Sequence, residues 1–154
     1  MNYEVRKLRR RELKAAAVDL GERVGVMNDA VGKNNSKGAP YSPAIRVDSK
    51  DALLFVSGQL PLNHGSGEIE STSVGGQTKV AMNNALAIAE AHGAGVHDVV
   101  KVGIFTTKLD ESSSINESYL SVMGEHRPAR LLVEVSALPR QALVEIEMVV
   151  RVRD

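Results

Sequence analysis

An arginine and two glutamates near the C-terminal end of the chain have the clearest chemical potential. Arg130 lies in the run RPARLLVEV at 127–135, and Glu145 and Glu147 lie in the run LVEIEMVV at 143–150. A guanidinium suits a planar carboxylate because it offers two parallel N–H donors and keeps its charge. A glutamate nearby can accept a proton from water or hydrogen-bond an amine or imine. The pattern therefore indicates either a site for a small carboxylate or an Arg–Glu salt bridge between subunits, and it favours neither.

Both runs read as strands, because apolar residues alternate with a period of two. In the first run the alternation predicts one core face and one polar face, formed by Leu131, Val133 and Val135 and by Arg130, Leu132 and Glu134 respectively. In the second run it predicts a core face of Val144, Ile146, Met148, Val150 and Val152, with Glu145, Glu147 and Arg151 opposite. Arg130 and Glu145 are therefore expected on the same mixed face of a sheet.

The spacing of the two runs sets a condition on how Arg130 and Glu145 could work together. If the strands formed a tight hairpin centred near residues 139–140, Arg130 would lie opposite residues 149–151. Glu145 would then be roughly 13–20 Å away along the strand. A shared ligand requires either that the strands do not pair in this way or that two subunits contribute.

The remaining pattern predicts an α+β domain with one sheet and two helices on one of its faces. Strands are expected at 44–47, 52–57, 98–107, 130–135 and 144–152, the first two joined as a hairpin by the polar turn 48–51. Helices are expected at about 73–92 and from Ser114, where Ser114 and Glu117 have the spacing of a capping box. The sheet face without helices needs a cover, and self-association is the simplest one.

Other residues could line a ligand site, each with an ordinary structural alternative. Tyr41 stands between two prolines, so its position is fixed, and it either covers the core edge or meets a ligand. Ser57 and Gly58 end the apolar strand 52–57, where a glycine allows another group to approach the backbone. Asn116 lies in the first turn of the second helix, where a polar residue is ordinary.

Composition excludes several classes of site. The 154 residues contain no cysteine, carry a formal net charge of zero and include only two Phe and three Tyr. These values exclude disulfides and cysteine-ligated zinc, and they argue against nucleic-acid binding. The four histidines lack the spacing of a metal site, and there is no phosphate-binding glycine motif, no nucleophile elbow and no apolar run long enough to span a membrane. A metal site is therefore not expected.

The chain divides into a basic N-terminal extension at 1–27 and a domain at 28–154. The extension has helical apolar spacing and is rich in arginine and lysine before residue 15. It reads as a helix that docks its apolar stripe on the body or on a neighbouring subunit. The alternatives are a mitochondrial presequence, against which its four acidic residues count, and an RNA-binding arm. The protein is expected in the cytoplasm, with the mitochondrion as the alternative.

Several short segments stand in a fixed order between residue 38 and the C-terminal end. They are GAPYS at 38–42, FVSGQLP at 55–61, VVK at 99–101, INxxY at 115–119, PAR at 128–130, VEV at 133–135, LP at 138–139 and VEIE at 144–147. Together these segments resemble the Rid family of reactive-intermediate deaminases, also called YjgF or RidA proteins. The resemblance implies a chorismate-mutase-like fold, a homotrimer with pockets between subunits, and hydrolysis of enamine or imine intermediates such as 2-aminoacrylate to 2-keto acids and ammonia without a cofactor.

The resemblance also implies roles for individual residues. Arg130 would bind the substrate carboxylate and Glu145 would position or activate the attacking water. The residues that would shape the pocket are Tyr41, Ser57, Gly58, Asn116 and Leu132. Leu132 stands where many members have cysteine, and Arg127 stands in a shortened segment where an apolar or aromatic residue is common. A larger or more acidic substrate, or a trimeric protein that binds carboxylate metabolites without turnover, are the alternatives.

Overall fold

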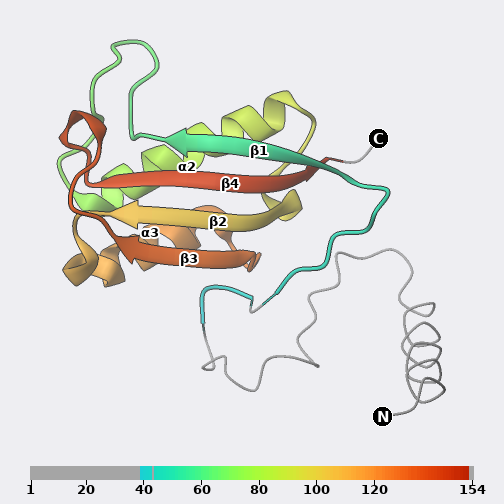
Figure 1. The fold of residues 1–154 in the computed structure, drawn as a ribbon. Coiled ribbons are helices and arrows are strands. Elements are labelled where there is room, and N and C mark those ends of the chain that lie inside the picture. The colour runs from blue at the N-terminus through green and yellow to red at the C-terminus, as the bar shows by residue number, and fades with distance from the viewer. Residues whose placement is uncertain (1–38, 43, 153–154) are drawn as a thin grey trace.

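A four-stranded mixed sheet forms one layer of the molecule and two helices form the other (Figure 1). This computed structural model describes residues 39–42 and 44–152, so the predicted extension at 1–27 lies outside the described residues. The strands are β1 (Ala52–Gln59), β2 (Val99–Thr106), β3 (Ala129–Glu134) and β4 (Val144–Val152). The helices are α2 (Val74–Ala91) and α3 (Ser112–Met123), with short 3-10 turns at Val96–Asp98, Leu109–Glu111 and Pro139–Gln141.

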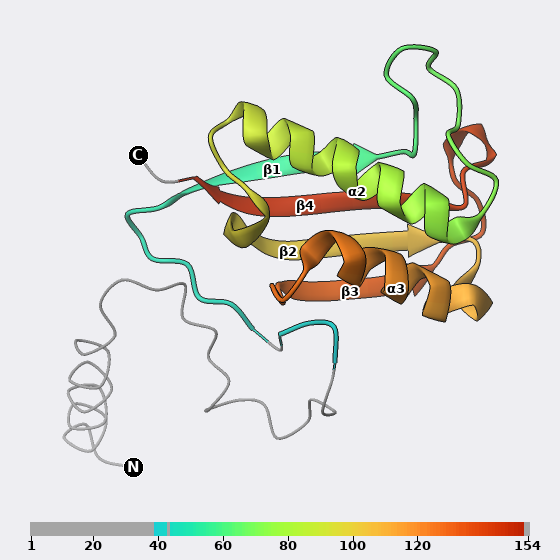
Figure 2. The same ribbon diagram turned by 180° about the vertical axis from the view of Figure 1, so that it is seen from behind.

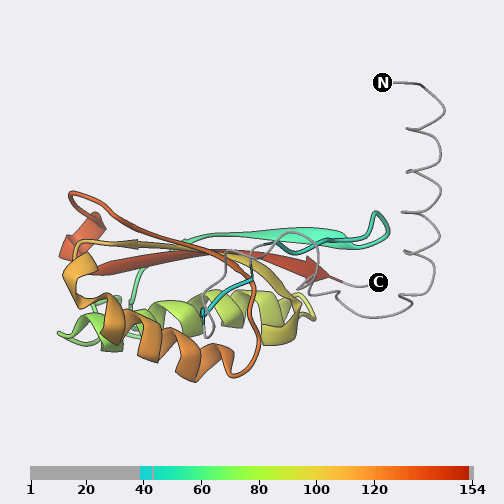
Figure 3. The same ribbon diagram turned by 90° about the horizontal axis from the view of Figure 1, so that it is seen from below.

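The strand order in the sheet is β1-β4-β2-β3. β4 pairs antiparallel with both β1 and β2, and β2 pairs parallel with β3. Both helices cover the same face of the sheet, as the views from behind and from below show (Figures 2 and 3). The predicted α+β architecture with two helices on one face is therefore confirmed. No helix of the described residues is long and apolar enough to cross a membrane.

The core lies between the sheet and the helices. Every second residue of β4 from Val144 to Val150 is buried, as the alternation predicts. Alanines at positions 81, 85 and 89 form the buried stripe of α2, and small side chains let that helix approach the sheet closely. α2 begins as predicted, because the Ser73 hydroxyl accepts a hydrogen bond from the Gly76 N–H.

Two predictions about local structure are wrong. Residues 44–47 form no strand, and β1 pairs with β4 instead of forming a hairpin with them. The segment before β1 is held at the other edge of the sheet, where Ser42 bridges Ala129 at the start of β3. The second helix begins at Ser112 after the turn Leu109–Glu111, not at Ser114, so the predicted capping box does not start it.

The predicted faces of β3 are also wrong, and this matters most for function. Arg130 and Leu132 lie opposite Val102 and Ile104 of β2, which are fully buried on the helix side. Residues opposite each other in neighbouring strands share a face, so Arg130 and Leu132 face the helices. Leu131 lies on the other side with 45% of its surface exposed.

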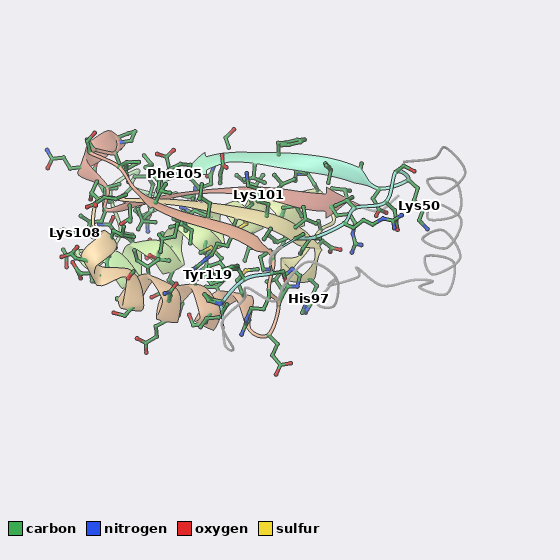
Figure 4. The ribbon with its side chains drawn as sticks, turned by 60° about the horizontal axis from the view of Figure 1, so that its bottom comes forward. Lys50, His97, Lys101, Phe105, Lys108 and Tyr119 are labelled. Carbon is green, nitrogen blue, oxygen red and sulfur yellow. The ribbon has the colours of Figure 1, made fainter. Side chains whose placement is uncertain are left out.

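The face of the sheet without helices, called the open face below, is both apolar and charged. Phe55 is 73% exposed there, and Leu53 and Leu131 are also exposed. Charged side chains lie among them, including Lys101 with Glu147 at 4.0 Å. Figure 4 shows Lys101 and Tyr119 on opposite sides of the sheet. Exposed apolar residues of this size on one sheet face are typical of a surface that another molecule covers.

Candidate active site

Arg130 lies between two tyrosines on the helix side of the sheet. Its Cζ atom is 4.8 Å from the ring centroid of Tyr119 on α3 and 5.9 Å from that of Tyr41. The side chain is half-buried, yet no carboxylate of the described residues forms an ion pair with it. Buried guanidinium groups are ordinarily paired, because an unpaired buried charge is costly. An unpaired arginine in this position indicates a site for an anionic ligand.

Three buried polar atoms of Arg130 and of α3 have no hydrogen-bond partner among the described residues. They are Nη1 of Arg130, the hydroxyl of Tyr119 and Oδ1 of Asn116. Asn116 and Tyr119 lie three residues apart on α3 and therefore on the same side of the helix. Buried polar atoms without partners are rare and require an explanation such as a water or a bound ligand. These atoms comprise hydrogen-bond donors and an acceptor that no described residue satisfies.

Burial shifts the pKa values of both Tyr119 and Arg130. Burial raises the pKa of the Tyr119 phenol to about 12, although the neighbouring Arg130 and Arg127 charges act in the opposite direction. Burial also lowers the pKa of Arg130, while Tyr119 and Tyr41 act to raise it. An arginine stays charged at neutral pH even after such a shift. The site therefore combines a positive guanidinium with a neutral phenol.

Tyr41 reaches Arg130 because its segment is tied to the beginning of β3. The Ser42 N–H donates to the Pro128 carbonyl at 3.0 Å, and the Ser42 hydroxyl donates to the Arg127 carbonyl. From there the chain runs on to β1 at the opposite edge of the sheet (Figure 1). The predicted site residues Tyr41 and Arg130 are thus brought together, although they come from separate parts of the sequence, and the predicted site residue Asn116 lies one turn before Tyr119 on α3.

Leu132 lies on the same face of β3 as Arg130 and packs against the buried core. Its side chain is half-buried and apolar, so it offers no hydrogen bond to a ligand. It can limit the size and polarity of whatever lies beside the Arg130 guanidinium.

Glu145 belongs to a second group on the open face. It lies opposite Phe105 of β2, and its neighbours Val144 and Ile146 point into the core. The register of β1 against β4 shifts between Val56 and Gln59. Gly58 lies in this irregular part, and a Cβ atom there would overlap the Glu145 carboxylate. A glycine at 58 is thus what allows the carboxylate to lie over the β1 backbone, next to the exposed Ser57.

The two groups lie on opposite faces of one sheet, and β2 separates their strands. The prediction that Arg130 and Glu145 share a face is therefore wrong, because the arginine side of β3 faces the helices. β3 and β4 do not pair as a tight hairpin, because β2 lies between them. Even so, a single chain does not bring the Arg130 and Glu145 side chains to one small ligand. Arg130 and Leu132, with Tyr41 beside the arginine, therefore lie on the helix side, where α3 carries Asn116, whereas Ser57, Gly58 and Glu145 lie at the open face.

Tyr119 ends the INxxY segment at 115–119 but was not among the predicted site residues. The structure puts its ring directly against Arg130. A signal was available, because Tyr119 follows Asn116 by three residues, which places it on the same side of a helix as a predicted site residue. The pairing with Arg130 was not visible, because it depends on which face of β3 the arginine occupies.

Known proteins resemble this chain over most of its length. The family model described as Endoribonuclease L-PSP matches residues 33–152. A RutC family protein of Pyrococcus abyssi is 42% identical over 110 residues, which cover 71% of this chain and 84% of the relative. A protein of Escherichia coli named 2-iminobutanoate/2-iminopropanoate deaminase is 32% identical over 128 residues, which cover 80% of this chain and 97% of the relative.

Solved structures agree with these relatives. The structure of RidA from the Antarctic bacterium Psychrobacter sp. is 32% identical, with a TM-score of 0.62 and coverage of 80% of this chain and 92% of its own. The structure of Escherichia coli TdcF with bound serine is 31% identical, with a TM-score of 0.61 and coverage of 78% and 97%. The chain belongs to the Endoribonuclease L-PSP family, the family of YjgF and RidA, as its sequence segments predict.

Proposed function

We propose that this protein hydrolyses small enamines and imines that carry a carboxylate, of the 2-aminoacrylate and 2-iminopropanoate type, to 2-keto acids and ammonia. The observation that carries the proposal is the half-buried Arg130, which has no carboxylate partner among the described residues and lies beside further unpartnered polar atoms. A relative named for the deamination of such imines and a relative that holds serine support the choice of a small amino-acid-derived ligand.

The reaction requires no redox step. An enamine such as 2-aminoacrylate first becomes its imine tautomer, as its terminal carbon gains a proton and its nitrogen loses one. Water then adds to the imine carbon, forming a C–O bond, while one proton of the water passes to Glu145 and then to the nitrogen. In the resulting carbinolamine the hydroxyl proton passes to the nitrogen, the C–N bond breaks, ammonia leaves and the hydroxyl oxygen becomes the keto oxygen. Arg130 would hold the carboxylate through paired N–H donors and so fix the imine carbon. Glu145 would act as the general base.

The two halves of the site would meet between copies of the chain, because they lie on opposite faces of one sheet. The open face would be covered by a neighbouring copy, which accounts for the exposure of Phe55 and Leu131 in a single chain. Ser57, Gly58 and Glu145 of one copy would then face the Arg130 group of the next. Such a head-to-tail contact closes into a ring, and we expect the homotrimer that the family resemblance implies.

The test is a coupled assay in which a serine dehydratase generates 2-aminoacrylate. The protein should accelerate pyruvate release beyond the uncatalysed rate, Arg130→Ala should abolish the acceleration, and Arg46→Ala should preserve it, because Arg46 forms an exposed ion pair with Asp48. No acceleration at any protein concentration would remove the proposed activity. Pyruvate binding that depends on Arg130, without turnover, would instead favour the non-catalytic metabolite-binding protein. The proposed reaction belongs in the cytoplasm, or in the mitochondrion if residues 1–27 direct the chain there.

A further inference from the structure

Tyr119 makes the nearest aromatic contact to the Arg130 guanidinium in the described part of the chain. It is fully buried on α3, and the Arg130 Cζ atom lies 4.8 Å from its ring centroid, compared with 5.9 Å for Tyr41. A guanidinium at this distance over an aromatic face is attracted by the negative face of the ring. Figure 4 shows Tyr119 on the helix side of the sheet, which is the side that Arg130 faces.

The ring also restricts how the arginine can move. A free arginine side chain loses considerable rotamer freedom when it binds a ligand. A rigid ring under the guanidinium orders that side chain on folding, so less of the entropy loss falls on ligand binding. Tyr119 is itself held in place, because it is buried in the core with Ile115 and Met123 one turn away on either side.

Tyr119 differs from an acidic partner in one important respect. A glutamate or aspartate beside Arg130 would hold the guanidinium but would also compete with a ligand carboxylate for it. The phenol stays neutral well above neutral pH, because burial raises its pKa to about 12. The tyrosine can therefore hold the guanidinium and leave its charge available.

We infer that Tyr119 is a positioning residue for Arg130, whose ring holds the guanidinium in the orientation that receives a ligand carboxylate. The inference rests on the proposed function only in taking Arg130 as the carboxylate anchor. It concerns binding and not turnover. Pyruvate, the keto-acid product of the proposed reaction, is therefore the probe.

The experiment measures the pyruvate dissociation constant of the full-length protein by titration calorimetry. Tyr119→Phe keeps the aromatic face and should bind pyruvate within about twofold of the wild type. Tyr119→Met removes the aromatic face but stays apolar, and should weaken binding by about three- to tenfold, the cost of ordering one long side chain on binding. Met123→Leu on the same buried side of α3 is the matched control and should change affinity by less than about twofold.

A second measurement requires no substitution of Tyr119. The Arg130 Nε–Hε resonance of 15N-labelled protein, assigned by its loss in Arg130→Lys, should lie upfield of ordinary arginines because of the ring current. It should also move on addition of pyruvate. An Arg130 Nε–Hε resonance at the chemical shift of ordinary arginines, unchanged by pyruvate, would overturn the inference. This test holds even if Tyr119→Met fails to fold.

The outcomes separate this inference from the proposed function. Wild-type affinity for pyruvate in folded Tyr119→Met, or an equal loss in Tyr119→Phe, would overturn the positioning role of the ring and leave the imine hydrolysis standing. The wild-type protein could fail to hydrolyse imines and still bind pyruvate in a way that depends on Tyr119. That result would remove the proposed activity and leave the positioning role of Tyr119 standing. A wild-type protein that does not bind pyruvate would overturn the anchor and the positioning role together.

Discussion

Arg130 and Glu145 point to opposite faces of the same sheet, with β2 between their strands. Arg130 faces the helices because it lies opposite the buried Val102, whereas Glu145 lies on the open face between two buried neighbours. If both act on one substrate, they must come from different copies of the chain.

This relationship predicts complementation between inactive variants. Arg130→Ala and Glu145→Gln should each be inactive alone, but mixed trimers should regain activity, because one copy still supplies Arg130 and its neighbour still supplies Glu145. In a head-to-tail trimer that contains both variants, one of the three interfaces carries both intact groups, so about a third of the wild-type activity is expected. Differently tagged variants should be co-expressed, the mixed trimers purified through both tags, and imine hydrolysis measured. Confirmed mixed trimers that stay inactive would show that the two residues do not share a site.

Gly58 should be required for the position of Glu145. A Cβ atom at residue 58 would overlap the Glu145 carboxylate, so Gly58→Ala should displace it and lower kcat by about tenfold or more, as misplacement of a reacting group does. Gly103→Ala is the matched control, because its Cβ would meet Glu147 on the same face. Steady-state kinetics on both variants, with melting temperatures, makes the comparison. An equal decrease of kcat in Gly58→Ala and Gly103→Ala would instead indicate a general disturbance of the open face.

The sequence was most informative where polar and apolar residues alternate strictly. In β4, glutamates separate Val144, Ile146 and Met148, so the buried face could be predicted. In β3, Leu131, Leu132 and Val133 are consecutive apolar residues, and alternation alone does not decide which of them faces the core. The structure decides it through pairing with β2, and this is why the face of Arg130 was predicted wrongly.

Pairings between distant segments were the other limit. The strand at 52–57 was correctly expected, but its partner is β4, which follows about ninety residues later, rather than the run at 44–47. The close approach of the Glu145 carboxylate to Gly58 depends on the same pairing of β1 with β4, so it could not be predicted from the residues around either position. By contrast, the start of α2 was predictable because Ser73 caps it through a neighbouring backbone N–H.

Phe55 should be required for assembly and dispensable for folding. Its ring is 73% exposed in the single chain and lies on the open face, so Phe55→Lys should leave the circular dichroism spectrum unchanged while shifting the protein to smaller species. Leu109→Lys, at an exposed position in the turn Leu109–Glu111, is the control and should not change the assembly. Light scattering after size-exclusion chromatography measures both. An unchanged mass for Phe55→Lys would show that the open face is not the interface.

Arg151 should contribute to stability rather than to catalysis. It is buried near the end of β4, with Nη2 at 3.1 Å from Asp98 and Nη1 at 4.0 Å from Asp51. Arg151→Ala removes both ion pairs of the buried guanidinium and should lower the free energy of unfolding by about 3 kcal/mol. Arg46→Ala breaks an exposed ion pair and should cost less than about 1 kcal/mol. Urea titrations of both variants measure the free energy of unfolding. A similarly small decrease in both variants would contradict a structural role for Arg151 and its two aspartates.

The buried phenol of Tyr119 predicts a specific pH dependence of stability. Its pKa is raised to about 12 in the folded protein and is about 10 for an unfolded chain. Its protonated form is therefore favoured by folding, and this contribution is complete below pH 10 and is lost as pH rises towards 12. The loss amounts to about 2–3 kcal/mol between these limits. Tyr119→Phe has no phenol and should show a correspondingly shallower fall in unfolding free energy over this range. Ile115→Val, a buried change on the same helix, should alter the stability without altering its pH slope. Equal slopes for Tyr119→Phe and the wild type would mean that the hydroxyl reaches solvent in the assembled protein.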